Sequence, residues 1–282
     1  MLMPDWEMEM GSIEKMIAGE MNHPELCQWS SEPLDRSLIW LIWSMGASAG
    51  LGPALRAAVA AAVYLVHRGL EVHEVERAQP GGGGVSATTV LAGDFFSSKY
   101  YLLLAKYGLV SLVGVLSGGV RRVNELKVRR RSWQWEEDPE GYGALCAEIE
   151  TGVVRGLLSG LSLRDPWPEI VRAAGRGFAL VRGGEWGHGG ALPSLMDLYV
   201  WASTTAEERR ALEESERSSG RVRALYAKYN AGDWVTDQLT EVCSLIRSRL
   251  ASLPRLGAEG LERMCSEWEA AWASWVPVAK ER

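Results

Sequence analysis

The chain has 282 residues and a hydrophobic content of 47%, which is enough to bury a substantial core in one large domain or two. Its 30 basic and 36 acidic residues give a net charge of -6, so nothing in the balance favours a nucleic-acid partner. The acidic start is unlike a signal peptide. The longest apolar runs fall short of the roughly 18 residues that a membrane span needs. We therefore expect a cytoplasmic protein without a membrane span.

Helical patterns dominate the first part of the chain, and strand patterns are scarce throughout. Residues 5–21 predict a short first helix of mixed polarity. Pro33 is expected to open the next helix, because proline suits a first helical turn. An alanine-rich helix follows over residues 55–67. The four glycines at 81–84 then predict a flexible connector, since they lack the lysine and hydroxyl of a phosphate-binding loop.

The stretch from Ala92 to Ala105 predicts a helix whose apolar side chains nearly encircle its axis, which indicates a central rather than a surface position. Asp94 suits the N-cap, where a carboxylate accepts hydrogen bonds from free backbone N–H groups. Gly108 suits the position just after the last turn. We expect the rest of the chain to be organised around this helix.

The remainder of the chain predicts more helices and one glycine-rich loop. Thr205 followed by Glu208 is typical of a capped helix start. The other expected helices cover residues 109–126, 142–161, 168–181, 221–228, 234–253 and 259–276, and the loop covers 183–190. The expected fold class is all-α. Residues 1–282 are expected to form a single domain, with residues 1–28 as a first helix or an N-terminal extension.

Four cysteines show no paired spacing, so we expect reduced thiols rather than a zinc site or a disulfide framework. They are Cys27, Cys146, Cys243 and Cys265.

Three segments resemble those of the trans-polyprenyl (isoprenoid) diphosphate synthases. Residues 91–95, Leu-Ala-Gly-Asp-Phe, are similar to a segment that precedes a helix near the subunit interface of that family. His67 and His73 keep the spacing of two histidines ahead of the family's first aspartate-rich motif. Residues 191–196 are similar to the Thr-Leu-Pro segment that opens the family's C-terminal helices. The resemblance extends from about residue 30 to 255 and implies an isoprenoid-synthase-like helical bundle.

The family's reaction ionises an allylic diphosphate, and carboxylates of two aspartate-rich motifs hold the magnesium ions that neutralise it. Where the first motif belongs, this chain has His73, Glu74, Glu76 and Arg77. Glu74 and Glu76 are two positions apart, so on a helix they point to nearly opposite sides and do not chelate one ion together. We interpret these residues as a vestigial diphosphate and metal region, the alternative being a solvated charged turn.

Other sites of diphosphate binding are also altered relative to the family. Asp35 and Arg36 stand where the resemblance implies a lysine- and arginine-rich segment, and Glu150 stands where it implies a lysine. No paired aspartates follow the segment 175–180, where the second motif belongs.

Two further carboxylate groupings are candidates for metal ligands, but each has a simpler reading. Asp233 and Asp237 share a helix face, although Asp233 suits an N-cap. Glu185 and His188 lie among glycines that give no preorganisation.

The degenerate motifs favour a non-catalytic regulatory or stabilising subunit of a heteromeric polyprenyl diphosphate synthase. Through the central helix, Asp94, Phe95, Phe96, Tyr100 and Tyr101 are expected to contact the catalytic subunit, in a heterodimer or heterotetramer, or to line a cavity that sets product length. No cofactor is expected in this chain, with Mg²⁺ held by the partner.

Other readings stay open: a weakly active prenyltransferase that condenses isopentenyl diphosphate with an allylic diphosphate, a protein that binds an apolar isoprenoid without reacting, or a homodimer.

Overall fold

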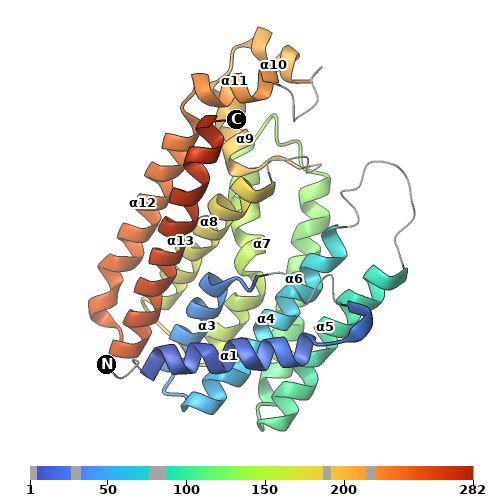
Figure 1. The fold of residues 1–282 in the computed structure, drawn as a ribbon, viewed down its shortest axis with the longest axis vertical. Coiled ribbons are helices and arrows are strands. Elements are labelled where there is room, and N and C mark those ends of the chain that lie inside the picture. The colour runs from blue at the N-terminus through green and yellow to red at the C-terminus, as the bar shows by residue number, and fades with distance from the viewer. Residues whose placement is uncertain (1–4, 27–32, 76–86, 187–191, 214–219, 282) are drawn as a thin grey trace. The chain divides into compact units, whose positions relative to one another are not determined.

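The computed structural model describes residues 5–26, 33–75, 87–186, 192–213 and 220–281, and all regular secondary structure within these ranges is helical (Figure 1). The prediction of an all-α fold is therefore confirmed. Within the same ranges, no helix is both long and apolar enough to cross a membrane.

The helices of the first part of the chain are α1 (Asp5–Met21), η1 (Pro24–Leu26), α3 (Arg36–Ser48), α4 (Pro53–Val75), α5 (Ala87–Lys106) and α6 (Ser111–Arg131). Those of the second part are α7 (Pro139–Gly160), α8 (Trp167–Trp186), α9 (Leu195–Ser203), α10 (Ala206–Glu213), α11 (Gly220–Lys228), α12 (Ala231–Arg249), η3 (Leu250–Ser252) and α13 (Arg255–Glu281).

These elements form two compact units. The first comprises residues 1–123, 152–168 and 249–264, and the second comprises residues 124–151, 169–248 and 265–282. Neither unit is a continuous stretch of chain, and α6, α7, α8, α12 and α13 contribute residues to both.

In the first unit, α1 packs on α4 and α5 through one apolar face (Figure 1). Its buried residues recur every three or four positions from Met10 to Met21, as an amphipathic helix requires. Glu9 also holds α1 in place: its Oε2 accepts a hydrogen bond from Nε1 of Trp43 on α3 at 2.8 Å. The same carboxylate accepts from Nη2 of Arg56 at 2.6 Å. Both partners of Glu9 are buried, so this contact ties α1 to α3 and α4.

The start of α3 differs from the prediction. The helix begins at Arg36 rather than at Pro33, because Asp35 is its N-cap and Oδ1 of Asp35 accepts from the backbone N–H of Leu38 at 3.2 Å. From Leu38 to Ala47 every residue of α3 is buried.

The start of α5 also differs. The helix begins at Ala87, so Asp94 lies within it and is not its N-cap; the Asp94 side chain is 68% exposed. Gly108 has φ +72°, which supports the expected helix end. The expected central position was wrong for one side of the helix, because Leu91 and Leu102 are more than half exposed.

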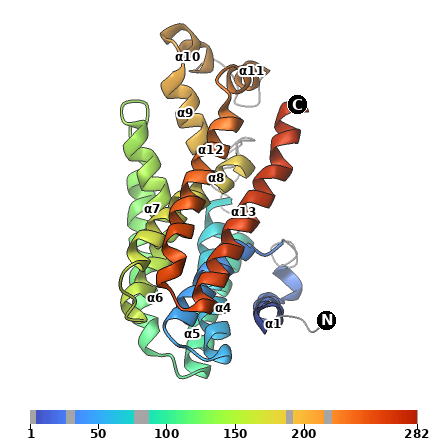
Figure 2. The same ribbon diagram turned by 90° about the vertical axis from the view of Figure 1, so that its left-hand side faces the viewer.

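In the second unit, α12 and α13 run side by side in both views (Figures 1 and 2). Nε1 of Trp272 on α13 donates to Oγ1 of Thr236 on α12 at 2.9 Å. The Trp268 ring packs edge-on against Phe178 of α8, with centroids 5.0 Å apart. These aromatic contacts form the core between the three helices.

Three local predictions in the second unit have mixed outcomes. The capped start at Thr205 is confirmed, since its backbone N–H donates to Oε2 of Glu208 at 2.9 Å and the reciprocal bond is also present. The loop expected from residue 183 was wrong in its first part, because α8 continues to Trp186. Asp233 is in the first turn of α12 but is not the N-cap, since that helix begins at Ala231.

Candidate functional site

The candidate site lies around the crossing of α4 and α5, where two glycines bring the backbones together. A Cβ on Gly69 of α4 would lie 2.8 Å from the carbonyl oxygen of Gly93 on α5. A Cβ on Gly93 would overlap the imidazole ring of His73. Glycine at both positions is therefore a steric requirement of this crossing.

The predicted vestigial region begins at this crossing. Nε2 of His73 lies 3.5 Å from Oδ1 of Asp94, so the two predicted groups are brought together across α4 and α5. Glu74 is half-buried at the end of α4. Glu76 and Arg77 lie outside the described residues.

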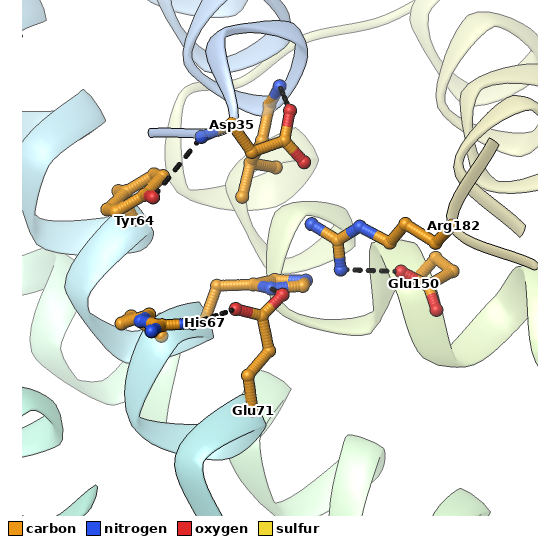
Figure 3. Close-up of polar contacts among 8 residues, drawn as sticks. Asp35, Tyr64, His67, Glu71, Glu150 and Arg182 are labelled. Atoms are coloured by element: carbon orange, nitrogen blue, oxygen red, sulfur yellow. Dashed lines mark hydrogen bonds and ion pairs between the residues drawn. The ribbon is translucent and has the colours of Figure 1, made fainter. Parts of the chain in front are cut away.

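A row of polar side chains follows one side of α4 and meets the start of α3 (Figure 3). The hydroxyl of Tyr64 accepts from the backbone N–H of Asp35 at 3.3 Å, and burial raises the pKa of Tyr64. One turn further on, Nδ1 of His67 lies 3.3 Å from Oε1 of Glu71. The other oxygen of Glu71 is 3.5 Å from Nη1 of Arg68. The Glu71 carboxylate therefore contacts both His67 and Arg68.

Sequence reasoning found His67 in this row but missed Tyr64, Arg68 and Glu71. The available signal was their spacing of three and four positions in an otherwise apolar helix, which places polar groups side by side.

A second internal pair lies in the second unit. Nη1 of Arg182 on α8 donates to Oε2 of Glu150 on α7 at 2.9 Å (Figure 3). The two side chains are 16% and 18% exposed. Glu150, noted in the sequence as an acid where the resemblance implies a lysine, is thus neutralised within the chain. Arg182 was not singled out from the sequence.

The five residues predicted to contact a partner or to line a cavity that sets product length differ in their exposure. Phe96 and Tyr100 are buried at 0% and 3% exposure, so their side chains belong to this chain's own core rather than to a surface. Phe95 is half-buried beside Lys99, whose Nζ is 4.7 Å from the ring centroid. Asp94 and Tyr101 are exposed and remain available to a partner.

Tyr100 and Tyr101 form a tilted ring pair beside the contact between α5 and α6. Their ring centroids are 3.9 Å apart, and the Tyr100 hydroxyl lies 2.9 Å from Oγ of Ser117 on α6. Burial raises the pKa of Tyr100 to about 12. A hydrogen bond with Tyr100 lowers the pKa of Tyr101.

The described residues do not fit a magnesium–diphosphate site. No group of three or more His, Cys, Asp or Glu side chains within the described ranges could hold a metal ion. Asp233 and Asp237 are both exposed on α12, and His188 lies outside those ranges.

Sequence comparison finds one family over the first part of the chain. Residues 23–159 match the family model described as heptaprenyl diphosphate synthase (HEPPP synthase) subunit 1. The chain is also 36% identical over 106 residues to heptaprenyl diphosphate synthase component 1 from Geobacillus stearothermophilus. That similarity covers 38% of this chain and 46% of the relative, so the chain spans less than half the length of the curated relative that it matches.

Structural comparison covers nearly the whole chain. A polyprenyl synthase from Caulobacter crescentus, crystallised with calcium and isoprenyl diphosphate, is 18% identical with a TM-score of 0.66, over 94% of each chain. A geranylgeranyl pyrophosphate synthase from Lactobacillus brevis, complexed with citrate, is 15% identical with a TM-score of 0.67, over 94% of this chain and 96% of that one. At such identities the likeness shows the fold. The resemblance found in the sequence is thus confirmed: the chain has the all-α fold of the polyprenyl synthases, and its residues 23–159 are similar to heptaprenyl diphosphate synthase subunit 1.

Proposed function

We propose that the chain is the non-catalytic, regulatory or stabilising subunit of a heteromeric polyprenyl diphosphate synthase. The observation that carries the proposal is the match of residues 23–159 to the subunit 1 family of such a synthase, together with the 36% identity over 106 residues to a component 1. Its partner is a catalytic subunit that carries both aspartate-rich motifs and the Mg²⁺ ions. The two assemble in the cytoplasm as a heterodimer or a heterotetramer.

The polar groups of the bundle support a non-catalytic role. Expelling diphosphate requires several carboxylates that converge on divalent cations. In this chain, Glu71 is engaged by His67 and Arg68, and Glu150 is engaged by Arg182. Each of these carboxylates therefore lies beside a cation of its own chain, and among the described residues neither belongs to a group of three or more His, Cys, Asp or Glu side chains that could hold a metal ion.

The exposed apolar side chains of α5 support a role in assembly. α5 uses Phe96 and Tyr100 inside its own unit but leaves Tyr101 and two leucines exposed on the other side. Large apolar side chains on a stable surface are typical of an interface with another protein.

Activity assays with and without a catalytic subunit test the proposal. The purified chain is incubated with Mg²⁺, farnesyl diphosphate and isopentenyl diphosphate, alone and mixed with the intact synthase subunit of the same organism. We expect no product from this chain alone and elongated polyprenyl diphosphate only from the mixture. Product formed by this chain alone would reject the proposal. So would a synthase subunit whose rate is unchanged by this chain.

A further inference from the structure

We infer that Ser132, in the turn between α6 and α7, is a phosphorylation site for a kinase that selects arginines before its target serine, and that the phosphate loosens this turn. The inference does not depend on the function proposed above. It starts from the sequence Arg129-Arg130-Arg131-Ser132. No other Ser or Thr among the 282 residues has a basic residue at each of the three preceding positions.

The hydroxyl of Ser132 is open to an enzyme. α6 ends at Arg131, and Ser132 is the exposed residue that follows it. Its Oγ donates to the backbone oxygen of Arg129 at 3.1 Å, so its hydrogen bond stays within the end of the helix. Residues 132–138 are not helical. A kinase can therefore reach the hydroxyl without displacing a side chain of the core.

The three arginines lie in the last turn of α6, which has to open for a kinase to bind them in an extended conformation. The backbone bonds that close this turn are long. The N–H of Ser132 donates to the oxygen of Arg129 at 3.2 Å, and the N–H of Trp133 donates to the oxygen of Arg130 at 3.4 Å. Helix ends of this kind fray at little cost. Arg129 and Arg131 are also exposed, so the segment matches the charge pattern that an acidic kinase groove selects.

Ser252 has the same local geometry without the run of arginines. It is exposed at a helix end, in η3, and its Oγ donates to the backbone oxygen of Arg249 at 2.7 Å. Arg249 stands three positions before Ser252, as Arg129 stands before Ser132. The two positions between them are Leu250 and Ala251 instead of arginines. Ser252 is therefore an internal control that separates charge selection from simple exposure.

The modification transfers one phosphoryl group from ATP. The Ser132 oxygen forms a bond to the γ-phosphorus while the bond from this phosphorus to the ADP oxygen breaks, and a carboxylate of the kinase takes up the hydroxyl proton. The products are ADP and a phosphoserine with a charge of about −1.5 to −2. The modified oxygen has no proton, so it no longer donates to the backbone oxygen of Arg129.

The new charge acts on the contacts that hold the turn. The Arg129 guanidinium lies over the Trp133 ring, 4.6 Å from its centroid, and Nε1 of Trp133 donates to the backbone oxygen of Asp138 at 3.3 Å. A phosphate attracts the guanidinium more strongly than an exposed ring does, because both partners are fully charged. It also repels the Asp138 carboxylate, which accepts from the N–H of Gly141 in the first turn of α7 at 2.9 Å. Both effects weaken the hold of Trp133 on the turn.

Phosphorylation of the intact, folded chain tests the inference. The protein is incubated with Mg²⁺-ATP and the catalytic subunit of cyclic-AMP-dependent protein kinase, a kinase that selects arginines, and mass spectrometry locates the phosphate. We expect Ser132 to be modified at least tenfold faster than Ser252. Arg129→Gln combined with Arg131→Gln should slow the modification of Ser132 at least tenfold, whereas Arg249→Gln should change it less than twofold. A cooperative thermal transition verifies that each variant is folded.

Three results would overturn the inference. Equal rates at Ser132 and Ser252, or a rate at Ser132 that the double variant leaves unchanged, would overturn selection by the arginines. A folded chain that stays unmodified while a peptide of residues 127–138 is phosphorylated would show that the fold protects the hydroxyl. Amide hydrogen exchange of residues 133–138 is expected to be at least threefold faster in the phosphorylated chain, and equal exchange would overturn the loosening of the turn.

Discussion

Arg182 and Glu150 form a largely buried ion pair in the second unit, with Nη1 and Oε2 2.9 Å apart. Removing one member of such a pair leaves an uncompensated charge in a poorly hydrated position. We therefore expect Glu150→Gln to lower the free energy of unfolding by about 2 kcal/mol, less than for a fully buried pair because both side chains keep some contact with water. Urea unfolding measures the change.

The matched control for this prediction is the double variant Glu150→Gln with Arg182→Met. It removes both charges and should recover part of the lost stability. A double variant whose loss equals the sum of the two single losses would show that the pair does not couple.

At the crossing of α4 and α5, we expect the addition of a single methyl group to Gly93 to lower the stability of the protein. Gly93→Ala places Cβ against the His73 ring, and overpacking of this kind costs about 1–3 kcal/mol. Gly19→Ala, in open space on α1, is expected to be neutral or stabilising by up to about 1 kcal/mol. Combining Gly93→Ala with His73→Ala should relieve the clash. Thermal unfolding of the four proteins checks the pattern, and equal losses for Gly93→Ala and Gly19→Ala would contradict it.

Glu208 predicts a pH dependence of stability. Hydrogen bonds from Lys228, Thr205 and Tyr229 lower its pKa from 4.5 to about 2. A carboxylate with a lowered folded-state pKa adds stability above its unfolded pKa and loses it as the pH falls toward the folded value. Wild type should therefore melt higher than Glu208→Gln at pH 6, and the difference should shrink between about pH 4.5 and 2. A difference in Tm that is constant over this window would refute the assignment.

Three cysteines predict slow thiol reactions in the folded protein. Burial raises the pKa of Cys146 to about 11, and Cys243 and Cys265 are fully buried. Since the thiolate is the reactive form, a Cys27→Ser variant should react with a disulfide reagent at pH 8 at least tenfold more slowly when folded than in guanidinium. Three thiols that titrate as fast in the folded state would contradict the prediction.

The helical fold could be predicted from the sequence because the patterns that indicate it lie within one helical turn or extend over a whole helix. The periodicity of residues 5–21 predicts α1 with the bounds observed. Thr205 and Glu208 form the expected cap because both partners lie within one turn. The start of α5 was misplaced, because a Gly-Asp pair is typical of a helix entrance, whereas Gly93 serves contact with His73 and Gly69.

The candidate site was less accessible to sequence reasoning. Which aromatic residues of α5 face inward depends on the neighbouring helices, so sequence reasoning placed buried Phe96 and Tyr100 together with exposed Tyr101 in one predicted interface or cavity. The pairing of Glu150 with Arg182 joins residues far apart in the sequence, and no local pattern indicates it.

Gly69 brings the main chain of α4 close to the carbonyl oxygen of Gly93 on α5, and the Ser97 side chain borders the same point. Because no long side chain can rearrange there to absorb a displacement, a shift of either helix at this crossing would have to move the other.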